Sequence, residues 1–250
     1  MVFSGNNFII FIIFDIHAIK TDIYDGFGGQ KGIQTSHIFD HAKKWKEQGK
    51  IKHLGISFHS TAKLLDRILI EHPEFVQIAL NYYDWEGEFV QSRHCYETIR
   101  KHGKKVIIME PVRGGFLANL PKLYESLLKA KDPNATTASW ALHFTMDLKD
   151  IIAVLSGIST LEQMRENIRL FKNPKPLTSN EKELLKQVVS ECKKTGPYKI
   201  SDFTKYSKYK YHGVPISAIL DAYNSAQIQP RPDFALDDIY LRSRMLEDGN

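Results

Sequence analysis

Cysteine is scarce in this sequence, and a long apolar run is absent. The 250 residues include two cysteines, Cys95 and Cys192, and neither belongs to a metal-ligand or redox spacing. This scarcity agrees with a reducing compartment, so we expect a cytoplasmic protein. The longest apolar run, Phe8–Phe14, is far shorter than the roughly 20 residues of a membrane-spanning helix, and no basic segment precedes it. The run is therefore predicted to be a buried strand, and we expect no membrane partner.

Neither sign of charge dominates, although the balance is basic. The net charge is +5 with 25% charged and 42% hydrophobic residues, which is ordinary globular composition. The lysines are scattered over predicted helix ends, as on a solvated surface. One segment, 198–212, interleaves lysines and tyrosines as a single-strand-binding patch does. No recognised nucleic-acid-binding fold surrounds it, so we expect no nucleic-acid partner.

Short apolar runs alternate with amphipathic helical stretches as far as residue 172. The runs lie at 8–17, 51–57, 75–80, 105–110 and 151–157. The predicted helices lie near 35–48, 61–71, 89–102, 121–130 and 135–146, and a final one follows the last run. Strict alternation predicts parallel βαβ units, hence a barrel or a doubly wound sheet. In both architectures the chemistry lies where strands end and helices begin.

The last apolar run ends in a glycine and leads into a well-specified helix. Ser159 and Glu162 form a capping box. The spacing of four apolar residues predicts one buried face: Leu161, Met164, Ile168 and Phe171. Gln163 and Asn167 lie one turn apart beside Arg165, near free backbone N–H groups that favour an anion. The residues alone leave two interpretations open, an ordinary capped helix and a phosphate or nucleotide site.

Five motifs, in order and in register, resemble the second half of an aldo-keto reductase barrel. They are "EQGKIKHLGISFHS", "FVQIALNYYDW", "VIIMEPVRGGFLA", "ASWALHF" and "VLSGISTLEQMRENI". The most similar branch carries a ferredoxin-like tail. The resemblance implies an α/β fold of the TIM (β/α)8-barrel type, N-terminally incomplete, with about five βα units. It divides the chain into a partial barrel over 1–175 and a helical C-terminal extension over 176–250.

The resemblance also implies an activity and its residues. The family transfers a hydride from NADPH, or from NADH as the alternative, to a small carbonyl substrate. It binds the cofactor without a Rossmann domain, and no glycine-rich Rossmann fingerprint follows a strand here. His17 resembles the active-site histidine, which orients and polarises the carbonyl through a hydrogen bond.

By resemblance, three groups of residues would bind the cofactor. The nicotinamide amide would be held by Ser57, His59, Gln77 and Asn81. The pyrophosphate would lie at Glu110, Pro111, Arg113, Gly114 and Gly115, where glycine admits close approach and arginine adds charge. The adenosine end would lie at Gly157, Ser159, Thr160, Gln163, Arg165 and Asn167. Arg165 would pair with a 2′-phosphate.

Two departures from the family pattern bear on activity. The family's proton donor is a tyrosine assisted by a lysine and an aspartate from the first three βα units, whereas this sequence begins at the fourth strand. Loss of the general acid costs about 10²–10⁴-fold in rate. The alternative function is therefore a catalytically dead nucleotide-binding protein or a fragment. In the tail, Phe203, Tyr206 and Tyr209 occupy the positions of three cluster cysteines, so we expect no iron–sulfur cluster and no metal.

The incomplete barrel also predicts self-association. A closed barrel has no edge strands, whereas a chain that begins at the fourth strand exposes one edge along Phe8–Phe14 and another along Ile151–Leu155. The first of these runs has high β-propensity, no charge and no proline, which is typical of aggregation-prone segments. We therefore expect association through exposed strand edges unless a partner supplies further βα units.

Overall fold

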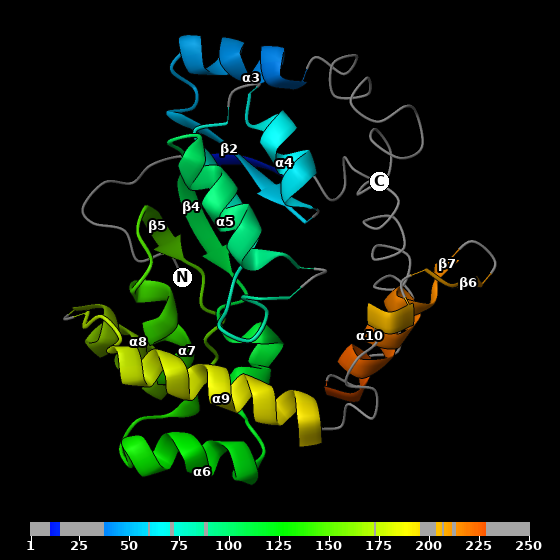
Figure 1. The fold of residues 1–250 in the computed structure, drawn as a ribbon. Coiled ribbons are helices and arrows are strands. Elements are labelled where there is room, and N and C mark those ends of the chain that lie inside the picture. The colour runs from blue at the N-terminus through cyan, green and yellow to red at the C-terminus, as the bar shows by residue number, and fades with distance from the viewer. Residues whose placement is uncertain are drawn as a thin grey trace. The chain divides into compact units, whose positions relative to one another are not determined.

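Five parallel strands form the main sheet (Figure 1). The computed structural model describes residues 11–15, 38–59, 61–70, 73–87, 90–172, 174–195, 204–206, 208–211 and 214–228. The strands are β1 (Phe11–Asp15), β2 (His53–Phe58), β3 (Phe75–Ala79), β4 (Lys105–Met109) and β5 (Ile151–Val154). They pair in chain order and every pair is parallel. All five predicted strands are therefore confirmed, and so is the α/β fold with consecutive βα units.

The α-helices up to residue 172 also lie where the sequence predicts them, with ends shifted by a few residues, whereas a 3-10 helix forms in a segment after β4 for which no helix was predicted. Those of the βα units are α3 (Ile38–Glu47), α4 (Ala62–Ile68), α5 (Ser92–Lys101), the 3-10 helix η2 (Arg113–Ala118), α6 (Lys122–Lys131), α7 (Thr137–Met146) and α8 (Leu161–Lys172). The C-terminal part contains α9 (Ser179–Thr195), η3 (Thr204–Tyr206), the hairpin β6 (Lys210–Tyr211) and β7 (Val214–Pro215), and α10 (Ile216–Ile228). Within the part of the chain that the structure describes, no helix is both long enough and apolar enough to cross a membrane.

Threonine caps explain several helix starts. Thr61 and Thr136 precede α4 and α7, and their hydroxyl oxygens accept hydrogen bonds from the backbone N–H groups of Leu64 and Ser139. Before α9, Thr178 and Glu181 form a reciprocal capping box, with the Thr178 N–H donating to the Glu181 carboxylate at 2.8 Å. Each cap satisfies backbone donors that have no partner inside the helix.

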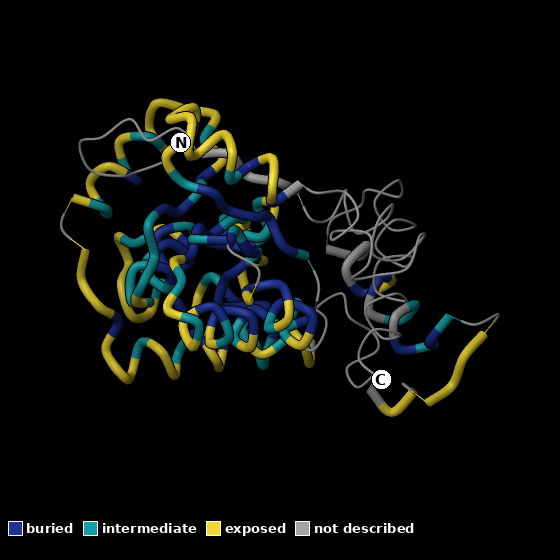
Figure 2. Tube along the Cα trace, turned by 90° about the horizontal axis from the view of Figure 1, so that it is seen from above, coloured by how far each residue is buried: buried dark blue, intermediate teal, exposed yellow. Residues whose placement is uncertain are grey.

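The central strands are apolar because both of their faces are covered. In β2 every residue after His53 is buried. Figure 2 shows buried residues in dark blue gathered in the interior of the part that holds the sheet. Phe75 of β3 packs with Ile107 and Ala153 from the next two strands. In register, Gly55 is the partner of Phe75, and the Phe75 ring fills the space that a Cβ at position 55 would need. Glycine is therefore required at this position by packing.

The chain forms two compact units that interleave along the sequence. Among the described residues, the first unit holds the sheet and consists of those up to Leu80 together with Asp84–Pro111 and Leu148–Leu161. The second consists of Asn81–Tyr83, Val112–Asp147 and everything from Glu162 onward. Its core contains buried side chains from several helices, among them Leu117, Tyr124, Trp140, Leu185 and Val188. The predicted boundary at residue 175 separates a partial barrel from a C-terminal extension. These compact units do not test that boundary, which stays a prediction.

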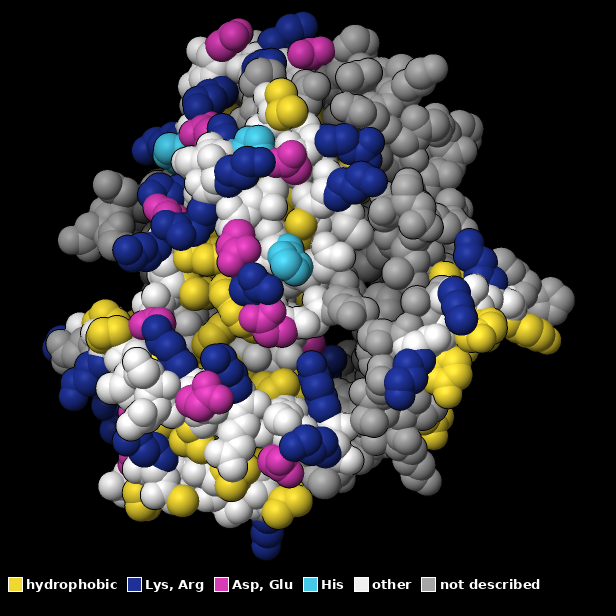
Figure 3. All heavy atoms as spheres, viewed as in Figure 1, with side chains coloured by type: hydrophobic (Ala, Val, Ile, Leu, Met, Phe, Trp, Pro, Cys, Tyr) yellow, Lys and Arg dark blue, Asp and Glu magenta, His cyan; other side chains and the backbone are white. Residues whose placement is uncertain are grey.

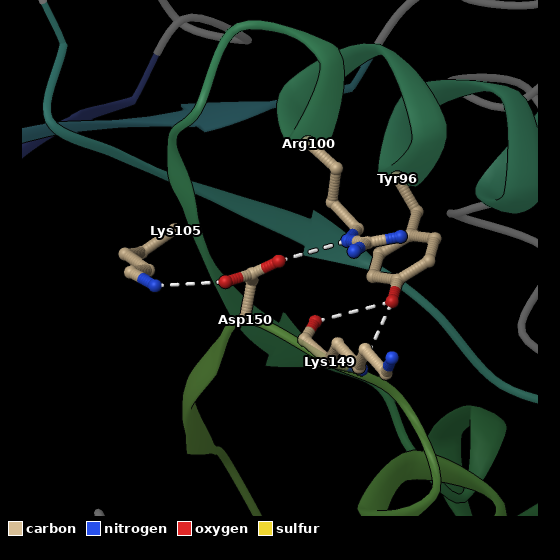
Figure 4. Close-up of polar contacts among 5 residues, drawn as sticks. All are labelled: Tyr96, Arg100, Lys105, Lys149 and Asp150. Atoms are coloured by element: carbon tan, nitrogen blue, oxygen red, sulfur yellow. Dashed lines mark hydrogen bonds and ion pairs between the residues drawn. The ribbon is translucent and has the colours of Figure 1, made fainter.

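A cluster of polar side chains connects α5, β4 and β5 through hydrogen bonds at the amino ends of the strands (Figure 4). Asp150, just before β5, accepts hydrogen bonds from Lys105 Nζ and Arg100 Nε, each at 2.8 Å. The Tyr96 hydroxyl donates to the Lys149 carbonyl oxygen at 3.1 Å and accepts from the Lys149 N–H at 3.0 Å. The hydrogen bond from Lys105, followed by that from Arg100, lowers the pKa of Asp150 to about 2. The cluster lies at the end of the sheet that serves stability in parallel-barrel folds.

The predicted apolar face of α8 is only partly confirmed. Leu161 is 58% exposed and Ile168 is 45% exposed, whereas Met164 and Phe171 are half-buried and Asn167 is buried. The Thr136 hydroxyl donates to the Glu166 carboxylate, beside Asn167, at 2.7 Å. The prediction failed for Leu161 and Ile168 because burial depends on which elements lie beside a helix, and periodicity does not specify them.

Charged and aromatic side chains of the C-terminal part are exposed. Lys and Arg side chains are spread over the face seen in Figure 3, as the sequence predicts. Tyr206 and Tyr209, at two of the cluster-cysteine positions, are 44% and 53% exposed, and Lys208 Nζ lies 5.1 Å from the Tyr209 ring centroid. Phe203 lies outside the described residues. Across the described ranges, no three His, Cys, Asp or Glu side chains gather as metal ligands would.

Candidate cofactor site

Polar side chains meet at the carboxyl ends of β2, β3 and β4. Ser57 and Gln77 are register partners on neighbouring strands, and Gln77 Nε2 donates to Ser57 Oγ at 3.4 Å. Ser57 Oγ also shares a hydrogen bond with His59 Nε2 at 3.1 Å. The same Gln77 nitrogen approaches Met109 Sδ at 3.4 Å. Three of the four residues predicted for the nicotinamide amide therefore belong to one hydrogen-bonded chain.

This polar chain has spare hydrogen-bonding capacity. Both polar contacts of Gln77 use its nitrogen, so within the described chain its carbonyl oxygen accepts no hydrogen bond. Ser57 is buried, whereas His59 and Gln77 are half-buried. A half-buried amide with an open acceptor, next to a serine hydroxyl, fits a planar amide on a ligand. The arrangement can orient a carboxamide on a ligand.

Asn81, the fourth residue of this group, has a local structural role. It is fully buried, and its Oδ1 accepts a hydrogen bond from the Tyr83 N–H at 3.0 Å. This contact fixes the turn that follows β3. Its role at the nicotinamide stays a prediction.

The segment after β4 turns through left-handed backbone. Glu110, Arg113, Gly114 and Gly115 have φ angles of 54°, 50°, 61° and 97°. Such a backbone costs glycine little and strains other residues. Glu110 is exposed and Pro111 is buried. The Arg113 guanidinium carbon lies 4.8 Å from the centroid of the Tyr83 ring, which also packs edge-on against Phe116. The turn thus presents one cation beside a glycine-rich backbone.

The residues predicted to bind the adenosine end of the cofactor follow β5, and all of them except Asn167 are exposed. Gly157, Ser159 and Thr160 are exposed, and so are Gln163 and Arg165 in the first turns of α8. Helix α8 begins at Leu161, one residue later than a cap at Ser159 implies, which is within the ordinary scatter of helix ends. Asn167 is 4% exposed, so its expected place beside Gln163 on an outward polar face was wrong. Asn167 is buried because it lies on the side of α8 that packs against the rest of the protein.

His17 lies outside the described residues. Strand β1 ends at Asp15, two positions earlier, and Asp15 is the register partner of Ser57. The strand that leads to His17 is therefore the neighbour of the strand that carries Ser57.

Two residues of the site were not predicted. Met109 is the last residue of β4 and contacts Gln77, and its place at a strand end was the available signal. Tyr83 lies in the junction "NYYDW", and its ring forms a cation–π contact with the Arg113 guanidinium. Nothing in the local sequence indicates that contact, because 30 positions separate the two residues.

Consecutive parallel βα units with polar groups at the carboxyl ends of the strands define a protein of the (β/α)-barrel class. The sequence profile described as "Aldo/keto reductase family" matches residues 13–190, which is most of the chain. The chain therefore belongs to the aldo/keto reductase family. No curated protein sequence matches it significantly.

Two solved structures that resemble this chain cover part of it. An aldo-keto reductase from Bacillus halodurans, in its holo form, is 18% identical with a TM-score of 0.52, covering 64% of this chain and 58% of its own. A glycerol dehydrogenase from Gluconobacter oxydans is 18% identical with a TM-score of 0.47, covering 62% and 53%. At 18% identity, the similarity to the Bacillus halodurans structure supports the fold alone. The chain spans less than two thirds of the length of either protein.

Proposed function

We propose that this chain binds a nicotinamide dinucleotide, NADPH in preference to NADH, and takes part in hydride transfer between this cofactor and a small carbonyl compound. The observation that carries the proposal is the Gln77–Ser57–His59 hydrogen-bonded chain at the carboxyl ends of adjacent strands, within the residues that match the family. When bound, the cofactor supplies the hydride.

The protein's own residues would bind and orient. The open acceptor of Gln77 would take an N–H of the carboxamide, and the Ser57 hydroxyl would fix its other side, which decides the ring face that meets the substrate. Arg113 and the left-handed glycines would hold the pyrophosphate. Arg165 would contact the 2′-phosphate and so favour NADPH. Cys95 and Cys192 are buried thiols outside any disulfide, which agrees with a cytoplasmic location, and that location is part of the proposal.

The first prediction tests the cofactor through Arg165. The variant Arg165→Ala should bind NADPH about tenfold more weakly and NADH unchanged, because only NADPH carries the 2′-phosphate. Gln163→Ala should weaken both cofactors. Quenching of intrinsic fluorescence gives each dissociation constant. Arg169→Ala, an exposed arginine in the last turn of the same helix, is the matched control and should bind both cofactors as the wild type does.

A turnover assay separates the proposed oxidoreductase from a nucleotide-binding protein without catalysis. NADPH oxidation is followed with a panel of aldehydes, with His17→Ala as the comparison. Turnover that His17→Ala abolishes supports hydride transfer by this chain. Binding without any turnover would favour the non-catalytic alternative, and unchanged binding by both Gln163→Ala and Arg165→Ala would remove the cofactor proposal.

A further inference from the structure

Two cations from distant parts of the sequence lie against one aromatic ring. The Arg113 guanidinium carbon is 4.8 Å from the Tyr83 ring centroid, and Lys193 Nζ of α9 is 5.9 Å from the same centroid (the helix is labelled in Figure 1). Tyr83 itself is 5% exposed, and Lys193 is exposed. The ring is therefore part of the core, while the ammonium group of Lys193 remains accessible to a ligand.

Core packing fixes the position of Lys193. Helix α9 buries Leu185, Val188 and Cys192 in the cluster that also contains Tyr83. Lys193 follows Cys192 directly, so the packed face of α9 determines where its side chain begins. The position of Lys193 beside the Tyr83 ring, which Arg113 also contacts, is thus a consequence of tertiary packing.

Lys193 differs from the other described lysines of α9. Lys182 pairs with Asp147, Lys186 with Glu183 and Lys194 with Glu191. Among the described residues, Lys193 forms no ion pair with a carboxylate, and its ammonium group lies against the Tyr83 ring. An exposed ammonium group that pairs with no carboxylate among the described residues attracts an anionic ligand.

We propose that Lys193 and Arg113 together form a binding site for a diphosphate group. The site includes the left-handed Arg113–Gly115 turn, whose glycines admit close approach of an anion to the backbone. Lys193 lies beyond residue 190, where the family match ends. Under the proposed function, on which this identification of the ligand rests, the diphosphate is that of NADPH.

The test compares Lys193→Gln with Lys194→Gln. Both variants remove one positive charge from the same turn of α9, but Lys194 is paired with Glu191. In low salt, Lys193→Gln should weaken NADPH binding about three- to fivefold, and Lys194→Gln should leave it unchanged. The difference should shrink as salt is raised, because screening weakens the contact. Thermal unfolding without ligand controls for folding of both variants.

Inorganic pyrophosphate separates this inference from the proposed function. It should raise the melting temperature of the wild type and of Lys194→Gln more than that of Lys193→Gln. If NADPH binds and both variants behave as the wild type does, the diphosphate site is wrong and the proposed function stands. If NADPH fails to bind but pyrophosphate stabilisation depends on Lys193, the cofactor proposal fails and the anion site stands. If pyrophosphate stabilises neither the wild type nor the variants, the anion site is overturned.

Discussion

Asp150 shows how a single residue can make stability depend on pH. Its pKa lies at about 2, below the ordinary 3.8, because Lys105 and then Arg100 donate hydrogen bonds to the charged form. A carboxyl whose pKa is lowered by folding contributes stability above its unfolded pKa and loses it as the pH falls through the folded value. This contribution is therefore present at neutral pH and is lost between about pH 4 and pH 2.

We predict that Asp150→Asn lowers the melting temperature at pH 7 and reduces the loss of stability between pH 4 and pH 2. Asn is the suitable replacement because Asp150 has a φ of 63°, which asparagine tolerates. Thermal unfolding followed by circular dichroism over pH 2–7 measures the effect.

Glu183→Gln is the control for this prediction, because it breaks an exposed ion pair with Lys186 and should change stability by less than about 1 kcal/mol. Wild-type and Asp150→Asn curves that run parallel down to pH 2 would contradict the role of Asp150.

At the scale of the element, Gly55 connects strand sequence to sheet packing. We predict that Gly55→Ala destabilises the fold by about 1–3 kcal/mol, because the added methyl group meets the buried Phe75 ring on the next strand. Urea unfolding followed by fluorescence measures this.

Gly157→Ala is the matched comparison for Gly55→Ala. A Cβ at position 157 meets nothing within 4 Å, so stability should stay within about 0.5 kcal/mol of the wild type. The double variant Gly55→Ala with Phe75→Leu should recover part of the loss, because the smaller side chain makes room. Equal costs at both glycines would contradict the packing argument.

Helix α8 shows the limit of periodicity as a guide to burial. The spacing of its apolar residues correctly predicts a helix, yet Leu161 and Ile168 are exposed and Asn167 is buried. Leu161 and Ile168 are two exposed apolar side chains on one helix. These exposed side chains are included in the prediction of self-association below.

At the scale of the whole molecule, we predict that the purified chain self-associates. Among the described strands, β1 and β5 stand at the two ends of the sheet order, and α8 adds exposed apolar side chains. Size-exclusion chromatography with light scattering should give a mass above that of one chain.

The variant Leu161→Glu with Ile168→Glu should lower the associated fraction if the α8 face contributes. Leu123→Glu is the control, because Leu123 is an exposed apolar residue of α6, outside both strand edges and outside α8. A stable monomer with a cooperative melt would show that the strand edges are covered.

The sequence by itself determined the order and type of the elements. Apolar runs bounded by turn residues predicted the five parallel strands, and amphipathic spacing predicted the helices up to α8. Linked motifs predicted the family, and the resemblance to that family pointed to Ser57, His59 and Gln77. These features are local, because periodicity, capping and turn chemistry act over a few residues.

Only the tertiary structure decided which residues meet. Strand register joined Ser57 to Gln77, core packing of α9 brought Lys193 to the Tyr83 ring, and the neighbours of α8 buried Asn167 in place of Leu161. Each contact joins residues that are distant in the chain or depends on what lies beside a helix. The local sequence does not encode these contacts, because they arise when whole elements pack and exclude water from their shared surfaces.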